Sequence, residues 1–242
     1  MRLKGEGFQL LVFKGIQKTT LIDFPGKVAS TLFLPKCNFR CPFCYNSQLV
    51  FEKGTGVDIP EKEALQFLEG RKGFLDGVCV TGGEPLLHQD LEGFLSRVKG
   101  LGLLTKLDTN GSKPEFLKRL LSKGLLDYIA MDIKAAPKDY NRAAGIRVDM
   151  DAIRESVESI KESGLGYEFR TTVVPGLHSR EGMLEIGKWL NGSKRFFLQQ
   201  FNAGMPLLDK SLEKAKPFTA EELECFAQSL KPFFKEVHVR GI

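Results

Sequence analysis

The sequence contains only three histidines among its 242 residues, and no hydrophobic run approaches the roughly 20 residues of a membrane-spanning helix. No long apolar segment follows residues 1–6, so we expect neither a signal peptide nor a membrane anchor. The net charge of +5 is small, and charges of both signs are mixed along the chain, which does not favour nucleic-acid binding. We therefore expect a cytoplasmic protein with neither a membrane nor a nucleic acid as its partner.

The sequence also lacks low-complexity segments and long linkers. Its hydrophobic content of 42% and charged content of 27% are typical of a globular enzyme. A chain of this length has room for one large α/β domain or for two small ones. Because no linker divides the chain, we expect a single domain over residues 1–242.

Cysteine is scarce, but three of the five cysteines stand close together. Cys37, Cys41 and Cys44 form a C-x3-C-x2-C pattern, and the odd total and missing leader argue against disulfides. Three thiolates on one loop can hold an iron–sulfur cluster. A cubane cluster has four irons, so three ligands leave one iron open to a small molecule. This arrangement indicates chemistry at the cluster rather than electron transfer alone.

Two simpler interpretations of the triplet are weaker. A structural zinc site prefers paired C-x2-C or His ligands, and none of the three histidines has such a spacing. Unrelated buried thiols would not be interleaved with Arg40 and Pro42. We expect the two remaining cysteines, Cys79 in an apolar strand and Cys225 on a helix, to pack in the core.

Strand and helix patterns alternate about six times along the chain. Ser112 with Glu115, and Thr219 with Glu222, have the spacing of helix capping boxes. The alternation predicts a parallel sheet with helical crossovers, either doubly wound or an incomplete barrel. We expect strands at residues 28–34, 77–81, 103–108, 128–133, 167–174, 195–201 and 236–240, and helices near residues 58–70, 91–98, 114–123, 150–163, 181–190 and 220–230.

In both designs the ligand lies at the carboxyl ends of the strands. The unusual polar residues follow these strand ends, with one group per strand. The candidate site residues are Cys37, Cys41, Cys44, Gly82, Gly83, Glu84, Asp108, Thr109, Asp132, Lys134, Arg170 and Asn202.

The cysteine triplet has an aromatic residue, Phe43, before its last member, and a strand ending in Gly-Gly-Glu-Pro follows further along the chain. Together these motifs resemble the radical S-adenosylmethionine (SAM) superfamily. Within it, four further motifs resemble the glycyl-radical-enzyme activating proteins, especially those of anaerobic ribonucleoside-triphosphate reductase. These motifs are Leu-Ile-Asp-Phe-Pro-Gly at 21–26, Leu-Asp-Thr-Asn-Gly at 107–111, Met-Asp-Ile-Lys at 131–134 and Val-Val-Pro-Gly at 173–176.

The resemblance implies an incomplete (β/α)6 TIM-like barrel with parallel strands. We expect an N-terminal β-hairpin extension over residues 1–27, with Pro25 and Gly26 in its turn. The barrel core would then cover residues 28–202, and a C-terminal helix–strand extension would cover residues 203–242.

The resemblance also implies an activity. A [4Fe–4S] cluster reduced by a flavodoxin- or ferredoxin-type protein would cleave S-adenosylmethionine to methionine and a 5′-deoxyadenosyl radical. In an activating protein this radical abstracts a hydrogen from a glycine of a glycyl-radical enzyme. The partner expected from the resemblance is anaerobic ribonucleotide reductase.

The resemblance assigns roles to the residues around the cysteine ligands. Phe43 and Tyr45 would shield the cluster and flank the adenine, or would only pack the loop. Gly82 and Gly83 let the backbone approach a ligand because they lack Cβ, and Glu84 could accept a hydrogen bond from the methionine ammonium.

The cations and the remaining polar residues complete the expected site. Lys134 and Arg170 would bind the carboxylate of S-adenosylmethionine, or would form salt bridges with Asp132 or Glu168. Matching residues in related activating proteins form a monovalent-cation site, here represented by Asp108, Thr109 and Asp132. Asn202 stands where several relatives have a histidine near the ribose.

Two other functions remain open at this point. One is a radical enzyme that acts on a small molecule such as a nucleoside or a cofactor precursor. The other is an iron–sulfur electron carrier, which would leave Gly82, Gly83, Glu84 and Lys134 unexplained.

Overall fold

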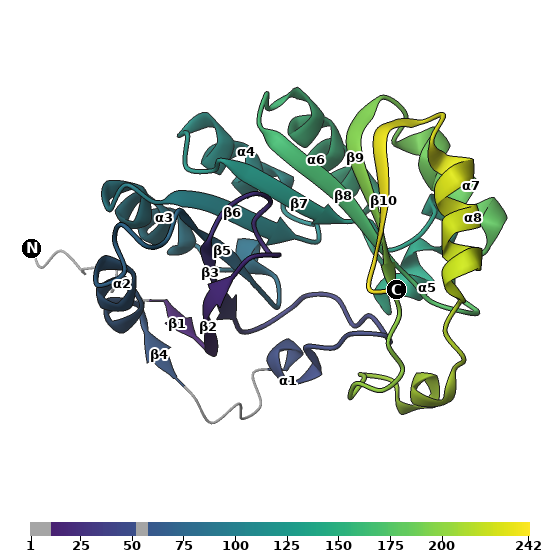
Figure 1. Cartoon of the computed structure of the whole chain (residues 1–242), viewed down its shortest axis with the longest axis horizontal. Coiled ribbons are helices and arrows are strands. Elements are labelled where there is room, and N and C mark those ends of the chain that lie inside the picture. The colour runs from purple at the N-terminus through teal and green to yellow at the C-terminus, as the bar shows by residue number, and fades with distance from the viewer. Residues whose placement is uncertain (1–10, 52–57) are drawn as a thin grey trace, which may run out of the picture.

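The computed structural model describes residues 11–51 and 58–242, and its main feature is one curved sheet of eight strands (Figure 1). Two short strands, β1 (Val12–Phe13) and β4 (Ile59–Pro60), form a separate antiparallel pair. The strands of the main sheet are β2 (Gly15–Thr20), β3 (Ala29–Leu34), β5 (Gly77–Gly82), β6 (Leu104–Thr109), β7 (Tyr128–Asp132), β8 (Gly166–Val173), β9 (Ser193–Gln200) and β10 (Phe234–Arg240).

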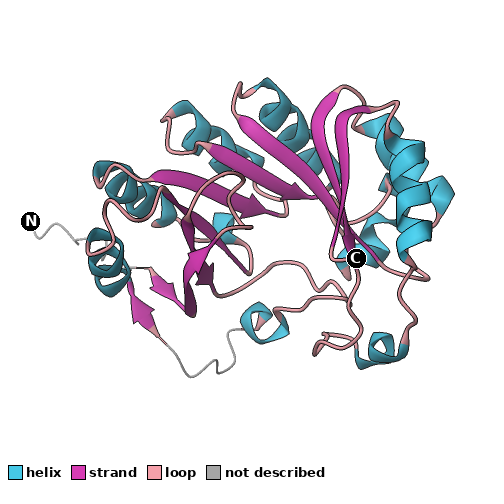
Figure 2. Ribbon diagram, in the orientation of Figure 1, coloured by secondary structure: helices cyan, strands magenta, loops and turns pink. Residues whose placement is uncertain are grey.

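Helices connect the parallel strands and lie along one side of the sheet (Figure 2). None of the helices among the described residues is both long and apolar enough to span a bilayer. The α-helices are α1 (Ser47–Val50), α2 (Glu61–Glu69), α3 (Leu91–Gly100), α4 (Pro114–Ser122), α5 (Tyr140–Ala144), α6 (Met150–Glu162), α7 (Arg180–Trp189) and α8 (Ala220–Leu230), and the 3-10 turns are η1 (Pro85–Leu87), η2 (Pro137–Asp139) and η3 (Lys210–Lys214).

The strand order across the sheet is β10-β9-β8-β7-β6-β5-β3-β2. Every neighbouring pair is parallel except β2 with β3, which is antiparallel. Because β2 and β10 are the two outer strands, the sheet curves without closing. A doubly wound sheet would carry helices on both faces, so the structure confirms the prediction of an incomplete barrel.

Residues 1–10 of the predicted N-terminal hairpin extension lie outside the described residues. In the described part, β2 pairs antiparallel with the first core strand, β3. Pro25 and Gly26 occupy the turn, in which the amide of Lys27 donates to the carbonyl of Phe24 at 3.1 Å. Gly26 has φ of +70°, a conformation that favours glycine. Phe24 packs against Tyr128, with ring centroids 6.0 Å apart, so this loop crosses the inner face of the sheet.

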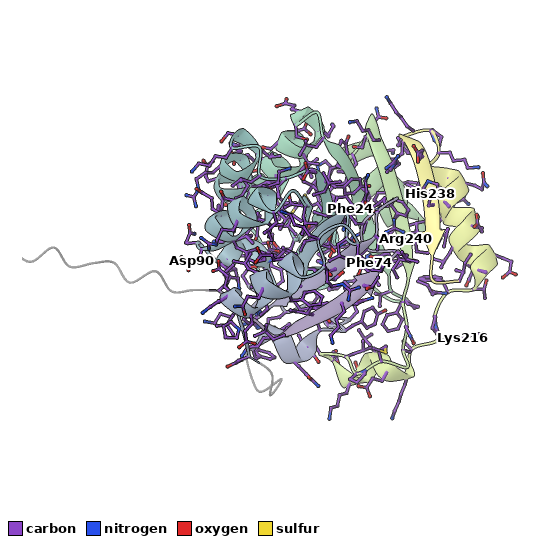
Figure 3. The ribbon with its side chains drawn as sticks, turned by 60° about the vertical axis from the view of Figure 1, so that its left-hand side comes forward. Phe24, Phe74, Asp90, Lys216, His238 and Arg240 are labelled. Carbon is purple, nitrogen blue, oxygen red and sulfur yellow. The ribbon has the colours of Figure 1, made fainter. Side chains whose placement is uncertain are left out.

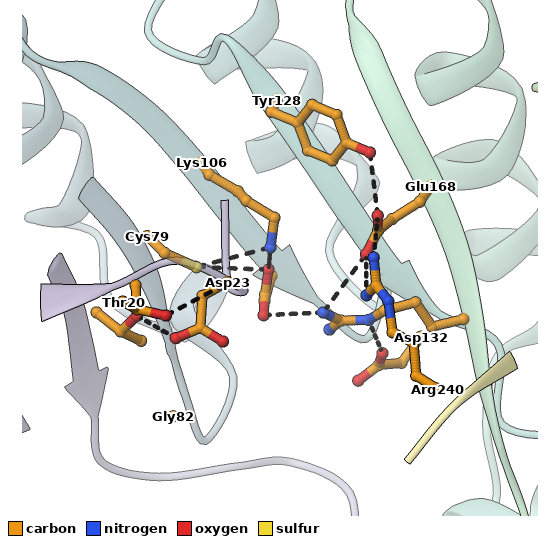
Figure 4. A network of polar contacts seen from close by, with 12 residues as sticks. Thr20, Asp23, Cys79, Gly82, Lys106, Tyr128, Asp132, Glu168 and Arg240 are labelled. Atoms are coloured by element: carbon orange, nitrogen blue, oxygen red, sulfur yellow. Dashed lines mark hydrogen bonds and ion pairs between the residues drawn. The ribbon is translucent and has the colours of Figure 1, made fainter. Parts of the chain in front are cut away.

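Side chains along the central strands point alternately to the two faces of the sheet, so the outer face is apolar and the inner face is polar. Leu107, Ile129 and Met131 are fully buried in the hydrophobic core beneath the helices. Lys106 and Asp108 lie on either side of Leu107 on β6 and therefore point to the inner face. There they take part in a polar network (Figure 4). The outer face therefore stabilises the fold, and the inner face is free to carry chemistry.

Three local predictions have different outcomes. The capping box of Thr219 and Glu222 is present at the start of α8. The predicted box at Ser112 is wrong, because the Ser112 hydroxyl accepts a hydrogen bond from Asn38 at 2.8 Å instead. Cys225 is exposed rather than packed in the core, because the buried face of α8 consists of its neighbours Leu223, Phe226, Ala227 and Leu230.

Candidate active site

The loop between β3 and α1 carries the three cysteines, and its backbone is fixed at several points. The amide of Lys36 donates to the carbonyl of Leu49, and that of Arg40 donates to the carbonyl of Ala144, both at 2.8 Å. The guanidinium of Arg40 also donates to the carbonyl of Cys37 at 2.6 Å, which closes the loop from inside. These bonds hold a segment without regular structure in one conformation.

The three cysteines share one cavity of about 360 Å³ at the carboxyl ends of the strands. This volume lies within the range of small-molecule sites. The structure thus brings together all but one of the residues predicted from the sequence. The predicted residues that line the cavity are Cys37, Cys41, Phe43, Cys44, Tyr45, Gly82, Gly83, Glu84, Asp108, Thr109, Asp132, Lys134 and Arg170.

Asn202 is the predicted residue that does not line this cavity. Its side chain is turned to its own loop, where Oδ1 accepts the amide of Gly204 at 2.9 Å. Its backbone N–H donates to the hydroxyl of Tyr45 at 2.7 Å. Asn202 therefore reaches the site only through Tyr45.

Gly82 and Gly83 allow a close approach, but the approaching group is the cysteine loop. A Cβ atom at Gly83 would lie 1.9 Å from the carbonyl oxygen of Lys36, and one at Gly82 would lie 2.3 Å from that of Leu34. The amides of Gly83 and Glu84 donate to the same two carbonyls, at 2.8 and 2.7 Å. The glycines consequently hold the end of β5 against the loop that carries the cysteines.

The Glu84 side chain is buried and connects three elements. Its carboxylate accepts hydrogen bonds from the Thr109 hydroxyl at 2.7 Å, the Asn110 amide at 2.7 Å and the Leu86 amide at 3.1 Å. Burial raises the pKa of Glu84 to about 7, although these hydrogen bonds oppose the rise. Glu84 thus fixes the end of β6 beside the cysteine loop.

Arg170 on β8 bridges the carboxylate of Asp132 on the neighbouring strand β7 and that of Asp108 on β6. Its Nε lies 2.8 Å from Asp132, and its Nη1 lies 3.1 Å from Asp108. Lys134 approaches the other oxygen of Asp132 at 3.1 Å. Burial alone would raise the pKa of Asp132, but Arg170 and Lys134 outweigh it and lower this pKa well below its usual range. The salt bridge predicted for Arg170 therefore forms with Asp132, while Glu168 lies at 3.9 Å.

Sequence reasoning missed two cations of this inner face. Lys106 on β6 is 1% exposed and pairs with Asp108. Arg240 on β10 (Figure 3) lines the cavity and donates to Glu168 at 2.9 and 3.2 Å. The Glu168 carboxylate also accepts the hydroxyl of Tyr128 at 3.0 Å. The available signal for Lys106 was its charge at an inward position of β6, two residues before Asp108.

Further cavity residues could not be assigned from motifs alone. Asn110 is one of them: its amide nitrogen donates to Asn38 at 3.0 Å and lies 3.9 Å from the sulfur of Cys37. The others are Phe39, Asn46, Val50, Thr81, Thr172, Gln199, Gln200 and Gly241.

His178 supports the site from outside the cavity wall. Its Nδ1 accepts the amide of Val174 at 2.9 Å, so its Nε2 carries the proton and donates to the carbonyl of Lys134 at 2.8 Å. Burial lowers the pKa of His178, which keeps the ring neutral. The ring of Phe43 meets it edge-on at 6.4 Å. His178 therefore positions both the backbone of Lys134 and the ring of Phe43.

The donor set fits an iron–sulfur cluster. Burial raises the pKa of Cys37 to about 12 and that of Cys41 to about 11, so the bare thiols stay protonated until a metal displaces the protons. Within the described ranges, no group of three or more Cys, His, Asp or Glu side chains is arranged to hold a single metal ion. In a cluster each thiolate binds a different iron, and the three cysteines that line this cavity could bind three irons.

The fold and this site define an iron–sulfur enzyme built on a partial barrel. Residues 31–186 match the family model of the radical SAM superfamily, and the chain belongs to that superfamily. Its cofactors are accordingly a [4Fe–4S] cluster and S-adenosylmethionine. The cluster supplies the electron that cleaves S-adenosylmethionine, and Cys37, Cys41 and Cys44 are the residues that would hold it.

Three known proteins illustrate the range of its relatives. A Methanocaldococcus jannaschii protein, provisionally named a glycyl-radical enzyme activating enzyme, is 30% identical over 234 residues, which cover 94% of this chain and 95% of that protein. A provisionally named GTP 3′,8-cyclase of Thermococcus kodakarensis is 29% identical over 60% of this chain and 47% of its own length. The crystal structure of Streptococcus suis SuiB bound to S-adenosylmethionine has a similar fold, with a TM-score of 0.66 at 17% identity over 87% of this chain and 52% of SuiB.

Proposed function

We propose that this protein is an activating enzyme that installs a glycyl radical in a partner enzyme. The observation that carries the proposal is the similarity to the M. jannaschii protein over nearly the whole length of both chains. The loop containing Leu21, Asp23 and Phe24 supports it, because this motif of activating proteins crosses the inner face of the sheet beside the cavity strands.

The proposed partner is an anaerobic ribonucleoside-triphosphate reductase, and a flavodoxin- or ferredoxin-type protein would reduce the cluster in the cytoplasm. The chain's own residues would bind and orient S-adenosylmethionine. Lys134 and Arg170 would hold its carboxylate, because both cations line the cavity beside Asp132. Phe43 and Tyr45 would cover the cluster and exclude water from the reacting atoms.

The test is the formation of the glycyl radical itself. The cluster-loaded protein is mixed under strict anaerobiosis with dithionite, S-adenosylmethionine and the reductase of the same organism, and EPR spectra are recorded. We expect a glycine-centred doublet on the reductase with the wild-type protein and with Cys225→Ala, and none with Cys41→Ala. Formation of 5′-deoxyadenosine without the doublet would refute this partner, while the absence of 5′-deoxyadenosine would refute radical chemistry.

A small-molecule substrate is the second candidate, and Arg240 is the observation that favours it. This arginine lines the cavity, and about a third of its side chain (34%) is exposed, so it could meet an anionic group such as a nucleotide phosphate. The Thermococcus relative is named for a reaction of GTP, but this chain spans less than half of it. Nucleotide-dependent formation of 5′-deoxyadenosine in the absence of any reductase would favour this candidate.

A further inference from the structure

The two inner-face carboxylates, Asp108 and Asp132, are each contacted on both oxygens by cations of the chain itself. Lys106 contacts Oδ1 of Asp108, and Arg170 contacts its Oδ2. Arg170 also contacts Oδ1 of Asp132, and Lys134 contacts its Oδ2. All four carboxylate oxygens therefore have a charged donor, and a bound metal ion would have to share each oxygen with a cation of the chain.

The charges of this group suit an anion. Lys106, Arg170 and Lys134 contribute three positive charges, and the two aspartates contribute two negative ones, which leaves one positive charge in excess. A bound carboxylate would neutralise this excess, whereas a sodium or potassium ion would double it. The oxygen donors thus do not fit the monovalent cation that the resemblance implied.

The other acids nearby have partners outside this group. Glu168 pairs with Arg240 and accepts the hydroxyl of Tyr128. Asp23 accepts the hydroxyl of Thr31 at 2.5 Å. Glu168 also lies 3.9 Å from Arg170, so the excess of one positive charge is counted for the five residues of this group alone.

We propose that the Lys106 ammonium is a built-in replacement for a monovalent cation at the S-adenosylmethionine site. Lys106 is 1% exposed and extends from β6 to the face of Asp108 that Arg170 leaves open. Burial would lower the pKa of Lys106, but the adjacent Asp108 outweighs it and keeps the ammonium charged. A positive charge on a covalent tether needs no ion from solution. Lys106 is thus a positioning residue, since it acts through Asp108 and Arg170 and does not line the cavity.

The proposal concerns the binding of S-adenosylmethionine and does not depend on which partner or substrate receives the radical. Its test is the dissociation constant of S-adenosylmethionine on the cluster-loaded protein. Binding is compared in potassium, sodium and N-methyl-D-glucamine chloride at a constant ionic strength of about 100 mM, so that screening is the same in each. We expect the wild-type constants to agree within about twofold.

Lys106→Met should create a dependence on the monovalent cation, because it leaves two cations facing two carboxylates. We expect binding in N-methyl-D-glucamine to be about tenfold weaker than in potassium. The double variant Lys106→Met/Asp108→Asn restores the excess positive charge and should lose this dependence again. Lys106→Arg keeps the charge and should behave like the wild type.

A second readout does not require the cofactor. Thermal unfolding of the cluster-free Lys106→Met protein should shift to higher temperature in potassium than in N-methyl-D-glucamine, because an ion that binds only the folded state stabilises it. Lys194→Met, which removes a lysine that contacts the Leu165 carbonyl and the Tyr167 ring, should show no such difference. Cation-dependent binding by the wild type would overturn the proposal, as would a Lys106→Met protein that is equally weak in all three salts.

Discussion

A Cβ atom on Gly83 would lie 1.9 Å from the carbonyl oxygen of Lys36, so the strand that precedes Glu84 and the loop that carries the cysteines are in direct backbone contact. We predict that Gly83→Ala separates them, destabilises the cluster-free protein by about 3 kcal/mol and reduces its iron content after reconstitution. Gly100→Ala is the matched control, since a Cβ there meets nothing within 4 Å. It should be neutral or slightly stabilising. Urea unfolding and iron analysis measure both effects, and equal results for the two variants would contradict the prediction.

The cysteines differ in their expected effect on iron binding. Cys41→Ala removes a proposed ligand, and we predict that reconstituted iron falls from about four to below about one atom per chain. Cys225 is exposed on α8, so Cys225→Ala should load iron like the wild type. Iron analysis and visible absorption decide the outcome. Full loading of the Cys41 variant would mean that this thiol is not a ligand.

Glu84 should give the cluster-free protein a specific dependence on pH. Its pKa is about 7 in the folded state against 4.5 for an ordinary glutamate, so between these values the folded state holds a proton that the unfolded state has lost. Stability relative to Glu84→Gln should therefore fall as pH rises from 4.5 to 7, by about 3 kcal/mol in total, and should level off above pH 7. Urea unfolding at several pH values measures this difference. A difference that does not change with pH would show that Glu84 is ionised throughout.

The two histidines His178 and His238 form a natural pair for testing support of the site. His178→Ala leaves a cavity and breaks the bonds to Val174 and Lys134, so we predict a loss of about 2–4 kcal/mol and weaker binding of S-adenosylmethionine. His238 is half exposed on β10, and His238→Ala should change stability by no more than about 0.5 kcal/mol. Chemical unfolding and ligand titration provide the readouts. The assignment fails if the two variants are equally mild.

Much of the fold followed from the sequence, because strand parity and helix periodicity are local signals. The capping box at Thr219 was correct for the same reason, since its two partners are three residues apart. Parallel strands bring their carboxyl ends to one edge, which explains why most of the candidate residues share one cavity.

The contacts between strands were harder to predict. Arg170 has three acids within reach, and the register of β7 against β8, which places Asp132 opposite Arg170, gives Asp132 the shortest contact. Lys106 could have been found from its position two residues before Asp108 on the same side of β6. Arg240 could not, because nothing in the sequence specifies that β10 adds to the sheet beside β9.

The bonds that hold the cysteine loop come from distant parts of the chain, and this has a consequence for biosynthesis. The amide of Asp209 donates to the carbonyl of Pro42 at 2.9 Å, and the amide of Asn202 donates to the hydroxyl of Tyr45. A nascent chain lacks these two donors until residues 202 and 209 have emerged from the ribosome. Delivery of the cluster by assembly factors should therefore follow the emergence of this segment, since the loop lacks two of its supports before then.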